Sequence, residues 1–79
     1  MDRRALRERL IQENVNADAY DLDSHAVDEA YVLEPSGGGF AVFYSERGLR
    51  TGERRFGTED EACRHLLDLL LRDRTTRRA

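Results

Sequence analysis

The sequence contains almost none of the residues that stabilise very small domains through covalent or metal cross-links. Cys63 is the one cysteine among 79 residues, so an internal disulfide is excluded and no second thiol is present for a zinc site. A chain of this length forms one domain, which buries roughly 60% of the surface that the unfolded chain exposes. The hydrophobic core alone, or a partner protein, must therefore stabilise the fold.

Long apolar runs are missing as well. The apolar run near the C-terminal end, Leu69–Leu71, is much shorter than the ~20 residues that span a bilayer. No charged start followed by an apolar stretch marks a signal peptide. We therefore expect a soluble, cytoplasmic protein that does not act at a membrane.

Lysine is also absent, and the charge is distributed unevenly. The 13 arginines are outnumbered by 16 acids, which gives a net charge of −3. Residues 18–34 carry −6 and the remainder of the chain +3. This acidic window has no basic residue and six acids, namely Asp18, Asp21, Asp23, Asp28, Glu29 and Glu34. It is either a solvated loop or a surface that meets a cationic partner.

The N-terminal third is predicted to begin with a helix from about Asp2 to Asn14. Leu6 and Leu10 are spaced four residues apart, and Ile11 and Val15 repeat that spacing. The asparagines at the end of this segment indicate a break. The acidic window then follows as an irregular connector or a short extended piece.

Three strands are predicted in the middle of the chain. Residues 29–34 are rich in β-branched and aromatic side chains and end at Pro35, after which Ser36 and three glycines form a turn. Residues 40–45 form the second strand, and residues 49–56 form a charged edge strand that Gly52 weakens. The glycine run leads into a strand and not into a helix, so we exclude a phosphate-binding loop.

The second helix has the clearest local signals. Thr58 and Glu61 match a capping box at its start. A broad apolar stripe follows, flanked by acid–arginine pairs at i, i+4, and it contains Ala62, Cys63, Leu66, Leu67, Leu69 and Leu70. We expect one domain over residues 1–71 and a mobile, arginine-rich tail over residues 72–79.

The predicted fold class is α+β in the order α-β-β-β-α, with a three-stranded antiparallel meander and both helices packed on one face. Strand alternation assigns Phe40, Val42 and Tyr44 to the core, with Phe56 closing it. Phe43 is then left on the open face, together with either Val32 or the Tyr31 and Leu33 pair, depending on strand register. We interpret this open face as a docking surface or a homodimer seam.

No constellation of catalytic residues is present in the sequence. Cys63 and His65 are two residues apart on a helix and point to different faces. No pair of acids lies in the apolar surroundings that tune a general acid. We predict that the protein is not an enzyme and uses no metal or cofactor.

A nucleic-acid-binding or regulatory module is the alternative function. Its basis is the arginines of the hairpin and tail, namely Arg47, Arg50, Arg54, Arg55, Arg72, Arg74, Arg77 and Arg78. The acidic total and the acids interspersed among these arginines oppose it, because phosphate binding requires a net positive face. We therefore do not favour nucleic acid as a partner.

Residues 29–71 also show a recognisable combination of motifs. Tyr31, Val32 and Leu33 precede a glycine turn, an aromatic strand ends in Phe-Tyr-Ser-Glu-Arg-Gly, and the second helix starts with Thr-Glu-Asp-Glu-Ala-Cys. This half of the chain resembles small bacterial immunity proteins of polymorphic toxin and contact-dependent inhibition systems. The resemblance implies tight, stoichiometric binding of a cognate protein toxin, without catalysis.

The acidic window would suit a cationic toxin surface, since charges steer association and interleaved aromatic side chains anchor the complex. Phe43 on the open face is a second place for contact. The predicted partner-binding residues are Asp18, Tyr20, Asp21, Asp23, Tyr31 and Phe43.

Overall fold

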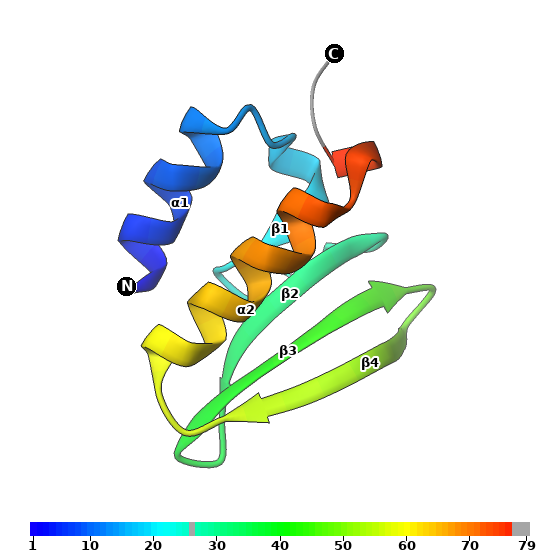
Figure 1. Cartoon of the computed structure of the whole chain (residues 1–79). Helices are drawn as coiled ribbons and strands as arrows, with labels where there is room; N and C mark the ends of the chain where they lie inside the picture. The colour runs from blue at the N-terminus through cyan, green and yellow to red at the C-terminus, as the bar shows by residue number, and fades with distance from the viewer. Residues whose placement is uncertain (26, 77–79) are drawn as a thin grey trace.

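Four strands form one sheet in the order β1-β2-β3-β4, and both α-helices lie on the same side of it in the computed structural model (Figure 1). The structure describes residues 1–25 and 27–76. In chain order the elements are α1 (Arg3–Gln12), the 3-10 helix η1 (Ala17–Ala19), β1 (Tyr20–Asp21), β2 (Ala30–Ser36), β3 (Gly39–Glu46), β4 (Leu49–Phe56), α2 (Glu59–Arg72) and the 3-10 helix η2 (Arg74–Thr76). The predicted α+β class and the placement of both helices on one face are confirmed.

The strand count differs from the prediction. β1 lies in the segment predicted to be a connector and pairs in parallel with β2, with Tyr20 opposite Tyr31 and Asp21 opposite Val32. The sheet is therefore mixed rather than a purely antiparallel meander. A two-residue strand is too short to give an alternating pattern, so the sequence alone did not indicate it.

Two tight hairpins connect β2, β3 and β4. Gly37 and Gly38 have φ angles of 54° and 80°, and Arg47 and Gly48 have φ angles of 51° and 78°. Positive φ at both central residues is typical of two-residue turns whose twist matches that of the strands. Gly39 starts β3, and a Cβ there would lie 2.4 Å from the carbonyl oxygen of Phe56, so only glycine fits.

The outer strand β4 has the predicted bounds and is exposed along its length except at Phe56. Gly52, with a φ angle of 65°, lies where the register between β3 and β4 shifts. The resulting β-bulge twists this edge, which together with its charges discourages pairing with another sheet.

The main core lies between the helices and one face of the sheet. Its fully or nearly fully buried members are Leu6, Leu10, Val15, Leu22, Leu33, Val42, Ala62, Cys63, Leu66 and Leu70. Phe40 and Phe56 pack against this core, as predicted, and so does Tyr31. Ile11 does not continue the stripe of α1, because it is rotated by about 100° around the helix from the buried Leu10, which leaves its side chain 64% exposed.

The second sheet face is not the open apolar surface that we predicted. Val32 lies opposite Phe43 in the register of β2 and β3, which settles the alternative left open by the sequence. Both side chains are buried, at 4% and 5% exposure. The Arg50 guanidinium lies 4.2 Å from the centre of the Phe43 ring and pairs with Glu34 at 2.9 Å. The prediction of an exposed docking patch at Phe43 is therefore wrong.

The two helices are capped and joined by polar contacts. At the start of α2, the Glu61 backbone N–H donates to the Thr58 hydroxyl oxygen at 3.2 Å, and this hydroxyl donates to the Glu61 carboxylate at 3.0 Å. The predicted capping box is confirmed. The N-terminal end of α1 is bound to α2, because both the backbone N–H and the Nε of Arg3 donate to the Glu59 carboxylate, at 2.8 and 3.2 Å.

We expected a mobile tail from Arg72 onward, but residues 72–76 are folded against the rest of the chain. α2 includes Arg72, and η2 then folds the chain back so that Thr76 is only 5% exposed. The Thr76 hydroxyl donates to the Leu70 carbonyl at 2.7 Å, and its own carbonyl accepts from the Asn16 N–H at 2.6 Å. The last arginines, at positions 77 and 78, lie outside the described residues.

Truncation of the core and removal of the cap should have different effects on stability. Leu66 is fully buried between α2 and the sheet, so Leu66→Ala should lower the free energy of unfolding by about 2–5 kcal/mol. Thr58→Ala removes one exposed cap and should lower it by about 1 kcal/mol. Urea unfolding of both variants measures the difference, and equal losses would show that α2 is not packed as described.

Candidate functional site

Asp21 has a structural role within the chain. The residue is only 3% exposed. Its carboxylate accepts hydrogen bonds from the backbone N–H groups of Asp23 at 3.1 Å, His25 at 3.1 Å and Val27 at 3.2 Å. Burial alone would raise the pKa of Asp21, but these three hydrogen bonds outweigh it and lower the pKa. Asp21 was predicted to contact a partner; its carboxylate has an internal role in the structure and presents little exposed surface for such a contact.

Three other acids of the window are also engaged within the chain. Asp23 pairs with Arg7 at 2.6 Å, and Asp28 accepts the Arg47 backbone N–H at 2.7 Å. Glu34 pairs with Arg50 across the second sheet face. Much of the negative charge seen in the sequence is thus balanced locally. Within residues 1–25 and 27–76, Asp18 and Glu29 form no ion pair.

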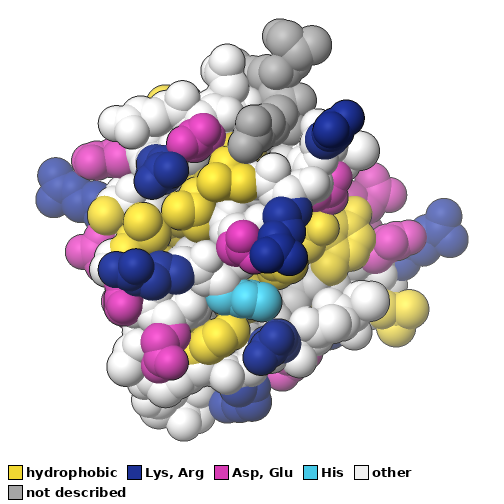
Figure 2. All heavy atoms as spheres, in the orientation of Figure 1, with side chains coloured by type: hydrophobic (Ala, Val, Ile, Leu, Met, Phe, Trp, Pro, Cys, Tyr) yellow, Lys and Arg dark blue, Asp and Glu magenta, His cyan; other side chains and the backbone are white. Residues whose placement is uncertain are grey.

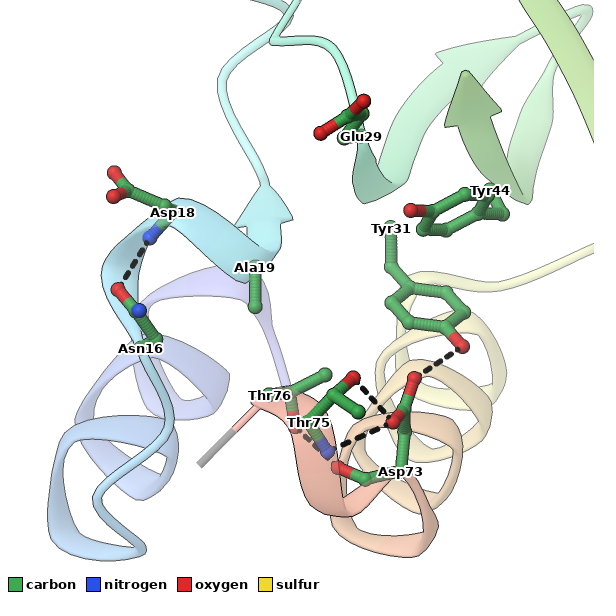
Figure 3. Close-up of a pocket in the computed structure, with 9 residues that line it drawn as sticks. All are labelled: Asn16, Asp18, Ala19, Glu29, Tyr31, Tyr44, Asp73, Thr75 and Thr76. Atoms are coloured by element: carbon green, nitrogen blue, oxygen red, sulfur yellow. Dashed lines mark hydrogen bonds between the residues drawn. The ribbon is translucent and has the colours of Figure 1, made fainter. Parts of the chain in front are cut away.

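The two remaining acids lie in one polar pocket, which we call the acidic pocket (Figure 3). Its volume is about 170 Å³, and it lies where η1, the start of β2 and η2 meet. The lining residues are Asn16, Asp18, Ala19, Glu29, Tyr31, Tyr44, Asp73, Thr75 and Thr76. Asp73 adds a third acid, and Figure 3 shows the carboxylates of Asp18, Glu29 and Asp73 on different sides of the pocket. They come from three separate parts of the chain, so folding is what brings them together.

Two tyrosines form the aromatic wall of the acidic pocket. The rings of Tyr31 and Tyr44 are 5.0 Å apart at an angle of 65°, an edge-to-face arrangement. The Tyr31 hydroxyl donates to Asp73 at 3.1 Å. Asp73 also accepts the Thr75 backbone N–H at 3.0 Å and its hydroxyl at 2.6 Å. Asp73 and Tyr31 are therefore held in place before any partner arrives.

The pKa values of the lining residues reflect a negative environment. Partial burial, and then the charges of Glu46 and Glu29, raise the pKa of Tyr44. Burial and the hydrogen bond to Asp73 raise the pKa of Tyr31, while the bonds from Thr75 lower the pKa of Asp73. These shifts keep both tyrosines neutral and Asp73 charged at neutral pH. A negative pocket with aromatic walls is suited to an organic cation.

The six predicted partner-binding residues do not form one site. Asp18 and Tyr31 line the acidic pocket, and Phe43 lies on the second sheet face. Tyr20, Asp21 and Asp23 line a groove beside α1. Sequence reasoning did not select Asn16, Tyr44, Asp73 or Thr75. The Asp73–Thr75 spacing was a local turn signal, but no pattern in the sequence placed it next to Tyr31.

Cys63 and His65 lie in different surroundings, as the helical spacing predicted. Cys63 is fully buried in the core, and burial raises the pKa of its thiol to about 11. His65 packs against Phe56 with ring centres 5.0 Å apart. Within the described residues, no group of three acidic, histidine or cysteine side chains is arranged to hold a metal ion. No helix in this part of the chain is long and apolar enough to cross a bilayer.

The arginines of the hairpin are partly neutralised by neighbouring acids. Arg50 contacts Glu53 at 3.5 Å in addition to Glu34, and Arg55 lies 3.9 Å from Glu53. On α2, Arg72 pairs with Asp68 at 3.1 Å. Figure 2 shows acids and arginines interspersed over the face that carries α1 and α2, with apolar side chains between them. This face therefore presents no continuous basic surface.

Comparisons with family models, with curated proteins and with solved structures gave no match for this chain. We therefore infer function from the acidic pocket and the chemistry of its residues.

The hydrogen bonds of Asp21 make stability depend on pH. Because the pKa of Asp21 is lower in the folded protein, its contribution is complete above the ordinary aspartate value of about 3.9 and is lost as the pH falls through the lowered pKa. Asp21→Asn should lower the free energy of unfolding by about 1–3 kcal/mol at neutral pH, since it removes charge-assisted bonds. Urea unfolding at neutral and acid pH measures this loss.

Asp23→Asn is the matched control, because Asp23 makes one exposed ion pair with Arg7 and its loss should cost less than about 1 kcal/mol. The difference between Asp21→Asn and the natural protein should shrink as the pH is lowered. A difference in unfolding free energy that stays constant as the pH falls below the lowered pKa of Asp21 would mean that the charge of Asp21 does not stabilise its bonds to Asp23, His25 and Val27.

Proposed function

We propose that this protein is an immunity-type binding protein, which neutralises a cognate bacterial toxin in the cytoplasm by forming a direct complex with it. The observation that carries the proposal is the acidic pocket. Asp18 and Glu29 line it without an ion-pair partner in the described chain, although Asp23 and Glu34 are paired. A cationic side chain of the partner, from arginine or lysine, supplies the missing charge. The resemblance of residues 29–71 to immunity proteins supports the same conclusion.

The pocket contributes to binding in two ways. Exposed carboxylates accelerate encounter with a positively charged surface, because long-range attraction steers the two proteins together. The tyrosine rings and the fixed Asp73 carboxylate then hold the cation over an aromatic wall. Little side-chain entropy is lost, since Tyr31, Asp73 and Thr75 already restrain one another. In this mechanism the protein covers an active site or essential surface of the toxin and performs no reaction.

Charge removal in the pocket should slow complex formation. The proposal requires a toxic domain encoded beside this gene; that domain, co-expressed with the protein and then purified, serves as the partner. Asp18→Asn combined with Glu29→Gln should lower the association rate about tenfold at low salt and less at high salt, because salt screens the attraction. Glu8→Gln is the control, since Glu8 is exposed on α1 and lies outside the pocket.

The natural protein should rescue cells from the toxic domain in the same experiment. A toxin that kills equally well when this protein is present would contradict the proposed function. Rescue with unchanged association rates in the pocket variant would leave the function standing and reject the acidic pocket as its site.

Nucleic acid should not bind appreciably, because two of the four hairpin arginines, Arg50 and Arg55, are paired with Glu34 and Glu53. We expect no retention of DNA or RNA in a gel-shift assay at low salt, where arginine-driven binding is strongest. Retention that falls steeply with salt and disappears in an Arg47→Gln, Arg54→Gln double variant would establish the alternative function instead.

A further inference from the structure

A groove lies beside the acidic pocket, between α1 and the segment that follows it. Its volume is about 370 Å³, and its lining residues are Arg7, Ile11, Ala17, Tyr20, Asp21, Leu22, Asp23, His25 and Val27. A smaller hollow of about 160 Å³ shares Ile11, Ala17 and Tyr20 with it. We call the larger one the α1 groove. Its walls combine an exposed isoleucine, a half-buried tyrosine and the buried Leu22.

The exposure of Ile11 follows from its position on α1, rotated by about 100° around the helix from the buried Leu10. It is 64% exposed and forms part of the groove wall. After the helix, Asn14 has a φ angle of 61°, and the Val15 N–H donates to the Leu10 carbonyl at 3.0 Å, which brings Val15 into the core. Leu49, at the β3–β4 turn, is the other large hydrophobic side chain of the described chain with comparable exposure, at 69%.

The α1 groove and the acidic pocket share one wall. Ala17 and Tyr20 line the groove, whereas Asp18 and Ala19, between them in the chain, line the pocket. Charge at the groove rim is largely balanced, because Asp23 pairs with Arg7. The unpaired negative charge lies on the pocket side, at Asp18 and Glu29. An occupant of both hollows therefore needs an apolar group next to a positive one.

We propose that the α1 groove receives an apolar side chain of the protein partner while a neighbouring arginine or lysine of the same segment enters the acidic pocket. The inference rests on the proposed function, and it specifies the chemistry that the partner must present. The apolar side chain displaces water from Ile11 and Tyr20, and the charge selects basic segments over acidic ones. Recognition thus requires two adjacent residues of different character, which distinguishes the correct partner from any polycation.

Three blocked peptides of otherwise identical sequence test this directly. The first contains an adjacent arginine and leucine, the second replaces the leucine with glycine, and the third replaces the arginine with glutamate. Amide chemical shifts of the protein are followed during each titration. The first peptide should shift residues of both hollows, including Ala17, Tyr20 and Glu29. The second should shift pocket residues alone and bind about fivefold to tenfold more weakly, and the third should not bind.

Ile11→Ser and Leu49→Ser form a matched pair of variants, because both side chains are exposed and neither substitution opens the core. Ile11→Ser should remove the advantage of the leucine peptide, and Leu49→Ser should leave it unchanged. Absence of groove shifts, or equal affinity of the leucine and glycine peptides, would overturn the inference. Concentration-dependent shifts at Ile11 without peptide would also overturn it, since a second copy of the chain would then fill the groove.

The outcome is separable from that of the proposed function. Peptide binding at both hollows in a protein that fails to rescue cells would contradict the immunity function and leave the two-residue recognition standing. Rescue by an Ile11→Ser variant that binds the toxin with unchanged affinity would support the immunity function and contradict the two-residue recognition.

Discussion

The buried carboxylate of Asp21 is the constraint on which the binding side of this molecule depends. It holds the backbone N–H groups of Asp23, His25 and Val27, and so fixes the path of the chain after β1. A buried charge is costly unless it is fully hydrogen-bonded, and here three donors meet that requirement. Just before Asp21 in the chain, Tyr20 lies opposite Tyr31, and η1 with Asp18 lies next to β1 at the edge of the sheet.

This constraint separates acids that look alike in the sequence. The Asp21 carboxylate accepts hydrogen bonds from the backbone, and Asp23 and Glu34 are paired with arginines. Asp18 and Glu29 remain, and the C-terminal η2 adds Asp73 from the opposite end of the chain. On the second sheet face, Arg50 lies over the Phe43 ring beside a hollow of about 200 Å³, and the outer edge is bulged and charged. The side formed by η1, β1 and η2 is therefore the surface best suited to a cationic partner.

Local signals predicted the scaffold well, and long-range contacts account for what they missed. The bounds of β4, the capping box at Thr58 and the apolar stripe of α2 follow from neighbouring residues, so they were predictable. The parallel pairing of β1, the bond from Asn16 to Thr76 and the burial of Phe43 depend on residues distant in sequence. The acidic pocket depends on the first two of these placements, which is why only Asp18 and Tyr31 were predicted among its residues.

The central claim is that the partner binds at η1, β1 and η2 and not at the second sheet face. Hydrogen–deuterium exchange of the protein, free and in complex with the toxic domain, tests it most directly. We predict that binding slows amide exchange in residues 14–23 and 29–31 and around Asp73, while β4 exchanges as in the free protein. Protection confined to β4 and to the residues around Phe43 would contradict the account.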